Sequence, residues 1–285
     1  MTAPGWLVAL WRDWVRPVWP FWLIFLAFAA IAVLAPWIAP NDPFRQNLLA
    51  RLRPPGSEAR GVFYLLGTDE IGRDLLSRLF YGARVSLLVA IAGVAFSAAL
   101  GGVLGVIAGL ARGAAEVIIM RLVDMVLSIP AILLAIVLVA VLGPGLDKVI
   151  LVLGLTRWPR FARVAYASTL SVAALPFVRV ARFNGVSIGR LVFRHILPNI
   201  AGPLVVVATL EFGLMILFEA GLSFLGLGVQ PPVPSWGSIL ATGRNYLGSA
   251  WWIATLPGLS LFLLALSVNM IGDHLRDRLD PRGRA

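Results

Sequence analysis

"PFVRVARFNGVSIGRLVFRHILPN", residues Pro176–Asn199, is a basic segment that lies between two strongly apolar ones. It holds four arginines, one histidine and no acidic residue. Its apolar residues keep helical spacing on both sides of Asn184 and Gly185, a pair that suits the left-handed end of a helix. Ser187 can cap a second helix, which a leucine–proline pair then interrupts before the next apolar run. The segment therefore predicts a helix, a sharp turn and a second helix.

Two interpretations of this basic segment stay open on pattern alone. A pair of amphipathic helices can lie on the membrane surface, with the arginines on anionic headgroups. A short helix can also dock into a groove of a cytoplasmic partner. Both interpretations place the segment at a membrane face, so the rest of the sequence has to decide between them.

The composition is that of an integral membrane protein. Apolar residues make up 59% of the chain and charged residues only 13%, whereas soluble domains hold about a quarter charged residues. The net charge of +10 comes from arginines at the ends of apolar runs, a distribution that indicates membrane orientation and argues against nucleic acid as a partner. With no cysteine and two histidines, the sequence predicts no disulfide and no metal site.

Six apolar runs reach about 20 residues, the length that crosses a bilayer. We therefore expect an all-α membrane protein with six transmembrane helices. The first run follows two arginines and is long enough to be an uncleaved anchor. The predicted spans are Trp19–Ala39, Val85–Leu110, Val117–Leu142, Val149–Ala167, Ile200–Leu222 and Trp251–Ile271.

An even number of spans puts both termini on one side of the membrane. The larger share of the lysines and arginines falls on the side that holds the termini and the 168–199 loop, which predicts cytoplasmic termini by the positive-inside rule. We expect residues 1–84 to form an anchor helix with an outer loop. Residues 85–285 would form the main transmembrane domain, in the cytoplasmic membrane of a prokaryote.

No motif for covalent chemistry is present. A P-loop needs a glycine-rich loop followed by lysine, but Lys148 is the single lysine of the chain and follows Asp147. The sequence also lacks the His-Glu-x-x-His pattern of zinc proteases. Residues Gly185–Gly189 match Gly-x-Ser-x-Gly in their letters, but they join two predicted helices, whereas the hydrolase motif needs a strand followed by a helix. We therefore expect a protein that is not an enzyme and holds no cofactor of its own.

The basic segment resembles the "EAA" loop of ABC-importer permeases, Glu-Ala-Ala-x-x-x-Gly followed after nine residues by Ile-x-Leu-Pro. An arginine stands where that family usually has its glutamate, and a valine replaces the first alanine. The resemblance implies that these positions contact the ATPase, with their polar contacts altered by the arginine. The positions of the motif fall on Arg179, Val180, Ala181, Gly185, His195, Leu197 and Pro198.

Two further stretches resemble the same family. "LGTDEIGRDLLSRLFYGARVSL" (Leu66–Leu87) is similar to the signature before the second span of the C-type permease subunit of dipeptide, oligopeptide and nickel transporters. "EAGLSFLGLGVQPPVPSWG" (Glu219–Gly237) is similar to the segment after the fifth span. The three motifs stand in the family's order between residues 66 and 285. The first 65 residues match in hydropathy alone.

The resemblance implies a binding-protein-dependent transport component with the type I, MetI-like permease fold. Such a chain forms half of a pathway for peptides or a related solute such as nickel. It pairs with a second homologous permease subunit, two cytoplasmic ATP-binding subunits that bind the ATP, and an external substrate-binding protein. In that family the loop that corresponds to 168–199 carries the coupling helices, which sit in a cleft of the ATPase.

Charges in the predicted outer loop suggest a capped helix. We expect the helix to begin at Thr68 or Asp69, with acidic residues in its first turn. One interpretation is a salt-bridged interfacial helix that leads into the second span. The other is a seat for the external binding protein. The residues of this outer motif are Asp69, Gly72, Arg73 and Asp74.

Glu211 and Glu219 on the fifth predicted span and Arg157 on the fourth are the costly groups inside the membrane, where a charge costs at least about 2.5–3.5 kcal/mol. Glu211 can line a translocation pathway, or it can pair with Arg157, and the sequence favours neither. Glu219 lies near the outer end, where we expect a structural hydrogen-bonding role. An alternative class, an ion-coupled transporter or channel, would use Glu211 as its proton or ion site.

Small residues repeat every fourth position along the second span and predict close helix packing within this chain. Three tryptophans, Trp236, Trp251 and Trp252, predict a belt at the outer membrane boundary. The residues of the small face are Gly93, Ser97, Gly101, Gly105 and Gly109.

Overall fold

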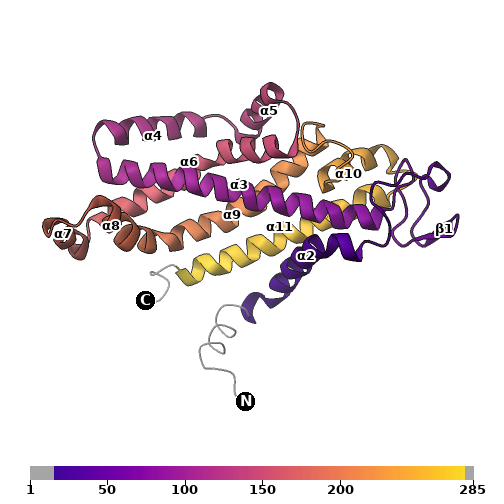
Figure 1. Ribbon diagram of the computed structural model, residues 1–285, viewed down its shortest axis with the longest axis horizontal. Coiled ribbons are helices and arrows are strands. Elements are labelled where there is room, and N and C mark those ends of the chain that lie inside the picture. The colour runs from indigo at the N-terminus through magenta and orange to yellow at the C-terminus, as the bar shows by residue number, and fades with distance from the viewer. Residues whose placement is uncertain (1–15, 280–285) are drawn as a thin grey trace, which may run out of the picture.

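The structure, a computed structural model, describes residues 16–279 and shows an elongated helical bundle (Figure 1). The two chain ends, which the sequence predicts to be cytoplasmic, lie outside the described residues. The α-helices are α2 (Trp19–Ile38), α3 (Leu75–Ala111), α4 (Ala114–Leu127), α5 (Ala131–Leu142), α6 (Leu146–Ala173), α7 (Pro176–Phe183), α8 (Ile188–Leu191), α9 (Leu197–Phe224), α10 (Trp236–Gly243) and α11 (Trp252–Leu279). Shorter elements are 3₁₀ turns at Arg16–Val18, Leu48–Ala50 and Arg244–Tyr246, a π-helical turn at Val192–Ile196, and an antiparallel hairpin of β1 (Ser57–Ala59) and β2 (Val62–Tyr64).

Among the described residues, four continuous helices are long and apolar enough to cross a membrane: α2, α3, α11, and the run Ile188–Phe224 that contains α9. Two bent pairs, α4 with α5 and α6 with α7, raise the number to six if each counts as one span. The expected six-helix, mostly helical fold is therefore confirmed. The hairpin is a small addition that the all-α expectation lacked.

The third predicted span, Val117–Leu142, is wrong as a single straight helix. α4 and α5 meet at a bend of 92°. Pro130 follows Ile129 at this bend and stands directly before α5. A proline disfavours helical geometry in the residue before it, so α4 stops and α5 starts in a new direction.

The predicted helix break at the leucine–proline pair is also wrong. The chain stays helical from Ile188 to Phe224, with Pro198 in the first turn of α9. A proline in a helix removes one backbone donor and crowds the carbonyl four residues back. Here that carbonyl belongs to the π-helical turn Val192–Ile196, whose wider ring tolerates the proline.

The small face of α3 packs against α6 within the same chain, which confirms the prediction. A Cβ atom added to Gly101 would overlap the carbonyl oxygen of Trp158 and lie 2.7 Å from Cβ of Phe161. One turn further along α3, a Cβ at Gly105 would lie 2.6 Å from Cβ of Ala165. The hydroxyl of Ser97 donates to the carbonyl of Gly154 at 3.0 Å. The two helices can approach this closely because glycine has no side chain.

Segments far apart in the sequence meet at the two ends of the bundle (Figure 1). α7 and α8 lie at one end, and the last turns of α11 point toward that end. We call this the α7 end. The hairpin, the start of α3 and α10 lie at the opposite end, which we call the hairpin end. The two loops that the sequence singles out are thus separated by the length of the bundle.

Candidate functional site

α7 ends as the sequence predicts, in a turn built on a left-handed glycine. Gly185 has φ +74°. Its amide donates to the carbonyl of Arg182 at 3.0 Å, and the amide of Val186 donates to the carbonyl of Ala181 at 3.2 Å. These two bonds are the Schellman pattern, which closes a helix and turns the chain. Ser187 occupies the N-cap position of α8, but its side chain makes no capping bond.

The residues of the EAA-like motif lie on this loop at the α7 end. Arg179 and Val180 are exposed on α7, and Gly185 is exposed at the turn. His195 is half-buried, with its ring 6.1 Å from that of Phe177. The other three are Ala181 and Leu197, which are half-buried, and Pro198, which is exposed.

The loop presents apolar side chains outward as well as inward. Val178, Leu191 and Ile196 are buried against the ends of α3 and α6. On the outer side Phe183 is 90% exposed and Phe193 75%. Large aromatic side chains that nothing covers, surrounded by arginines, are typical of an interaction surface. We call Phe183, Ile188 and Phe193 the exposed crest.

Arg157 and Glu211 form a buried ion pair in the middle of the bundle. Nε of Arg157 lies 2.6 Å from Oε2 of Glu211, and Nη1 of Arg160 lies 3.2 Å from Oε1 of the same carboxylate. The Arg157 guanidinium also stacks on the ring of Phe218 at 4.7 Å. α6 supplies both arginines and α9 supplies the glutamate.

The same glutamate borders a cavity of about 440 Å³. Arg160 and Arg163 line this cavity together with Glu211 and apolar residues of α4, α6 and α9. Arg163 also pairs with Asp124 of α4 at 2.5 Å. The two interpretations of Glu211 are therefore compatible, because one carboxylate both pairs with Arg157 and faces an open, arginine-lined space.

Glu219 lies in a different environment, fully buried between α3 and α9. Its two carboxylate oxygens accept hydrogen bonds from Ser86 of α3 at 3.0 Å and from Ser223 of α9 at 2.7 Å. These bonds satisfy a group that burial alone would strongly destabilise. The carboxylate links two spans.

At the hairpin end, the predicted capped helix at Thr68 or Asp69 is wrong. The helix starts at Leu75, and Asp74 is its N-cap, with its side chain accepting from the amide of Ser77 at 3.0 Å. Gly67 and Gly72 both have positive φ values, +79° and +77°. Such left-handed residues do not continue a right-handed helix, so residues 67–74 form a compact loop instead.

This loop holds a buried charge cluster around Asp69. The carboxylate accepts from the amides of Ile71 and Arg73 at 3.0 and 2.9 Å, and from Nε of Arg73 at 2.6 Å. Arg78 of α3 lies 3.4 Å from the same carboxylate. Burial, together with the charge of Asp69, raises the pKa of the neighbouring Glu70 carboxyl. The cluster fixes the loop onto the start of α3.

Two of the three tryptophans are buried, so the predicted belt at the membrane boundary is wrong for Trp236 and Trp252. The indole of Trp236 donates to the carbonyl of Leu79 at 2.9 Å, and that of Trp252 donates to the carbonyl of Thr68 at 3.1 Å. Both rings belong to the core that joins α2, α3, α9 and α11. Sequence reasoning missed these anchors, although Trp236 lies within the family-like stretch Glu219–Gly237.

Trp252→Phe is expected to lower the free energy of unfolding by about 1–3 kcal/mol, because it removes the donor to a buried carbonyl. Trp251→Phe is the matched control, since Trp251 is half exposed and donates no hydrogen bond in the described residues. Urea unfolding of the purified protein in detergent measures both changes. Equal effects of the two substitutions would contradict the assigned anchor.

The helix arrangement matches that of a solved importer. The chain superimposes on a chain of the inward-facing MetNI methionine ABC transporter with a TM-score of 0.58 and 19% identity, covering 72% of this chain and 98% of that one. This likeness defines the fold as that of a type I ABC importer permease.

Residues 101–284 match the family described as "Binding-protein-dependent transport system inner membrane component". The chain belongs to this family, and it is a multi-pass inner-membrane permease. Among its relatives, the di/tripeptide transport system permease protein DppC of Pseudomonas aeruginosa is 46% identical over 88% of this chain and 83% of its own length. The dipeptide permease DppC of Escherichia coli is 45% identical over 88% of this chain and 84% of its own length. The probable D,D-dipeptide permease DdpC of the same organism is 40% identical over 88% of this chain and 82% of its own length. The expected family is confirmed.

Proposed function

We propose that this chain is one of two permease subunits of an ATP-driven importer for short peptides, with residues 85–285 as its permease domain. The relatives at 46, 45 and 40% identity are named as permeases for di- or tripeptides. Such a chain needs ATP-binding partners, because its sequence has no P-loop. A second permease completes the pathway, and an external binding protein delivers the peptide.

The exposed crest is the observation that carries the proposal of ATPase coupling. Phe183, Ile188 and Phe193 are 90, 74 and 75% exposed on a loop at the α7 end. Arg179, on the same loop, is exposed as well and carries a charge opposite to that of the family's glutamate. The pattern suits a short helix that inserts an aromatic anchor into a groove of its partner. The α7 end is then the cytoplasmic side, which agrees with the arginine distribution.

At the centre, the cavity beside Glu211 suits a section of the pathway. Arg160 and Arg163 bring positive charge to its wall, and Glu211 brings a negative one. A zwitterionic peptide finds partners there for both of its ends. α6 carries Arg160 and Arg163 and continues to the turn before α7, so it can transmit a movement of the 168–199 loop to this cavity.

Phe183→Asp is expected to reduce co-purification of the ATP-binding subunits by at least about tenfold, because an interface anchor contributes about 2 kcal/mol or more. ATP-dependent peptide uptake by reconstituted vesicles should fall in parallel. Phe63→Asp is the matched control, since Phe63 is an exposed phenylalanine of β2 at the opposite end. The Phe63→Asp control should co-purify with the ATP-binding subunits as the wild type does.

Three results contradict the proposal. The docking assignment is wrong if the Phe183 variant folds and retains its ATPase at the wild-type ratio. Uptake that continues without ATP and follows an ion gradient identifies an ion-coupled transporter instead. ATP-dependent uptake that accepts no peptide overturns the substrate class.

A further inference from the structure

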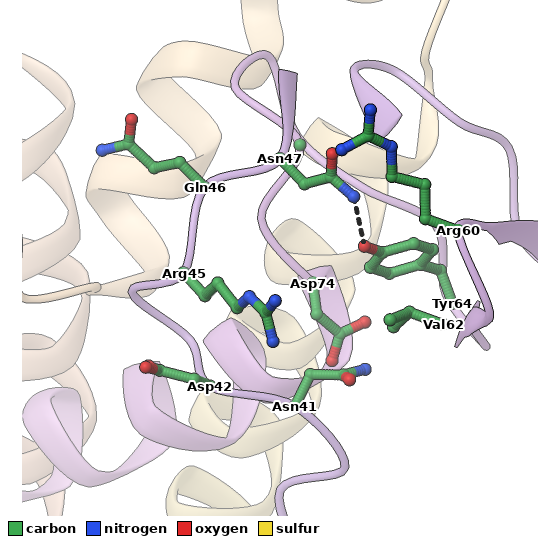
Figure 2. Close-up of a pocket in the computed structure, with 10 residues that line it drawn as sticks. Asn41, Asp42, Arg45, Gln46, Asn47, Arg60, Val62, Tyr64 and Asp74 are labelled. Atoms are coloured by element: carbon green, nitrogen blue, oxygen red, sulfur yellow. Dashed lines mark hydrogen bonds between the residues drawn. The ribbon is translucent and has the colours of Figure 1, made fainter. Parts of the chain in front are cut away.

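A polar pocket at the hairpin end has no role in the function described so far. It has a volume of about 230 Å³ and lies between the segment after α2, the β-hairpin and the start of α3 (Figure 2). One wall of the pocket is closely packed: Gly72 lies so near the backbone of Asn47 that a Cβ atom at Gly72 would overlap the carbonyl of Asn47. Gly72 and Asp74 belong to the family-like stretch Leu66–Leu87, and the other lining residues come from positions 41–64.

Asp74 supplies an unsatisfied negative group to this pocket. The residue is 2% exposed, and its Oδ2 accepts two hydrogen bonds, from the amide and the hydroxyl of Ser77 at 3.0 and 2.6 Å. Its Oδ1 is buried and has no hydrogen-bond partner among the described residues. A buried, charged oxygen without a donor is costly, so the site lacks a cationic or strongly donating group.

Two arginines, Arg45 and Arg60, also line the pocket. The guanidinium of Arg60 lies beside Asn47, and that of Arg45 extends toward the Asp74 side (Figure 2). Neither arginine forms an ion pair with any of residues 16–279. The second acidic lining residue, Asp42, accepts a bond from the amide of Phe44 at 2.8 Å and so stabilises its own turn. The pocket combines an acceptor that lacks a donor with donors that lack an acceptor.

We propose that this pocket binds a small zwitterion, with the ligand's ammonium on Oδ1 of Asp74 and its carboxylate on Arg45 and Arg60. The volume is below the roughly 300–1,000 Å³ of sites for drug-sized ligands, and it suits a dipeptide. The choice of a peptide as the ligand rests on the proposed function, whereas the charge pattern of the pocket does not. The pocket would hold a peptide at the outer face of the permease, before or after its transfer from the binding protein.

The test is calorimetric titration of alanyl-alanine into the full-length protein in lipid nanodiscs. We expect saturable binding that weakens at least about tenfold in Asp74→Asn, the loss expected for a hydrogen bond between charged groups. Asparagine is as good an N-cap as aspartate, so α3 should keep its start. Arg45→Gln combined with Arg60→Gln should weaken binding similarly. Arg51→Gln is the matched control, because Arg51 is an exposed arginine of the same loop that does not line the pocket.

Modified ligands test the same assignment without changing the protein. N-acetyl-alanyl-alanine lacks the ammonium and alanyl-alanine amide lacks the carboxylate, so both should bind at least about tenfold more weakly. Absence of binding by alanyl-alanine, or equal binding of all three ligands, overturns the site. Peptide uptake by the complete importer separates the proposed zwitterion site from the proposed function. If peptides are taken up but do not bind at the pocket, the site is rejected and the proposed function stands. Binding with no ATP-dependent uptake of any peptide rejects the proposed function alone.

Discussion

Glu211→Ala is expected to lower the free energy of unfolding by about 3–5 kcal/mol, the range measured when one partner of a buried ion pair is removed. The substitution leaves the Arg157 guanidinium buried, without the carboxylate that now lies 2.6 Å away. Arg160 is affected less, because about half of its side chain is exposed. Chemical unfolding of the purified protein in detergent measures the change.

A double variant separates the unpaired charge from the lost packing. Arg157→Met with Glu211→Leu removes both charges, and replacing a buried pair by apolar residues is often neutral or stabilising. We expect it to recover most of the stability that Glu211→Ala loses, while peptide uptake stays low because the cavity loses its negative group. Arg163→Ala breaks the more exposed pair with Asp124 and should change stability by less than about 1 kcal/mol. A double variant no more stable than the single one would count against the buried pair as the cause.

Gly101→Ala is expected to lower the free energy of unfolding by about 1–3 kcal/mol, the usual effect of overpacking a core. The new methyl group would overlap the carbonyl of Trp158 on α6, a backbone atom that moves only if the two helices separate. This loss should exceed the gain of about 1 kcal/mol that alanine brings to a helix. Larger side chains at the same position should prevent accumulation of folded protein.

Gly102→Ala is the matched control for this prediction. It lies on the same helix, one residue further on, and a Cβ atom there would meet no atom within 4 Å. We expect its stability to stay equal or to rise by up to about 1 kcal/mol through helix propensity alone. Thermal unfolding of the two variants side by side checks the difference. Equal midpoints would show that α3 and α6 do not pack as closely as the structure places them.

Local rules explain most of what the sequence predicted correctly. The turn at Gly185 follows from a helix that ends in asparagine and glycine, and the bonds that close it join residues at most five positions apart. The close packing of α3 follows from a repeat of small residues read on one helix. The prediction of where the outer helix starts was wrong for a local reason as well. Asp69 and Asp74 are both good N-caps, but the left-handed Gly72 between them prevents a helix from starting before Asp74.

The sequence by itself determined the class of protein, the approximate spans and the family, because hydropathy, helical periodicity and motif spacing are properties of neighbouring residues. The tertiary structure alone decided which distant groups meet. Glu211 bonds to Arg157, which lies 54 positions away in the sequence. The indole of Trp252 bonds to the carbonyl of Thr68, 184 positions away. Such contacts depend on how whole helices pack, and a buried charge or indole is satisfied by whichever partner that packing brings within hydrogen-bond distance.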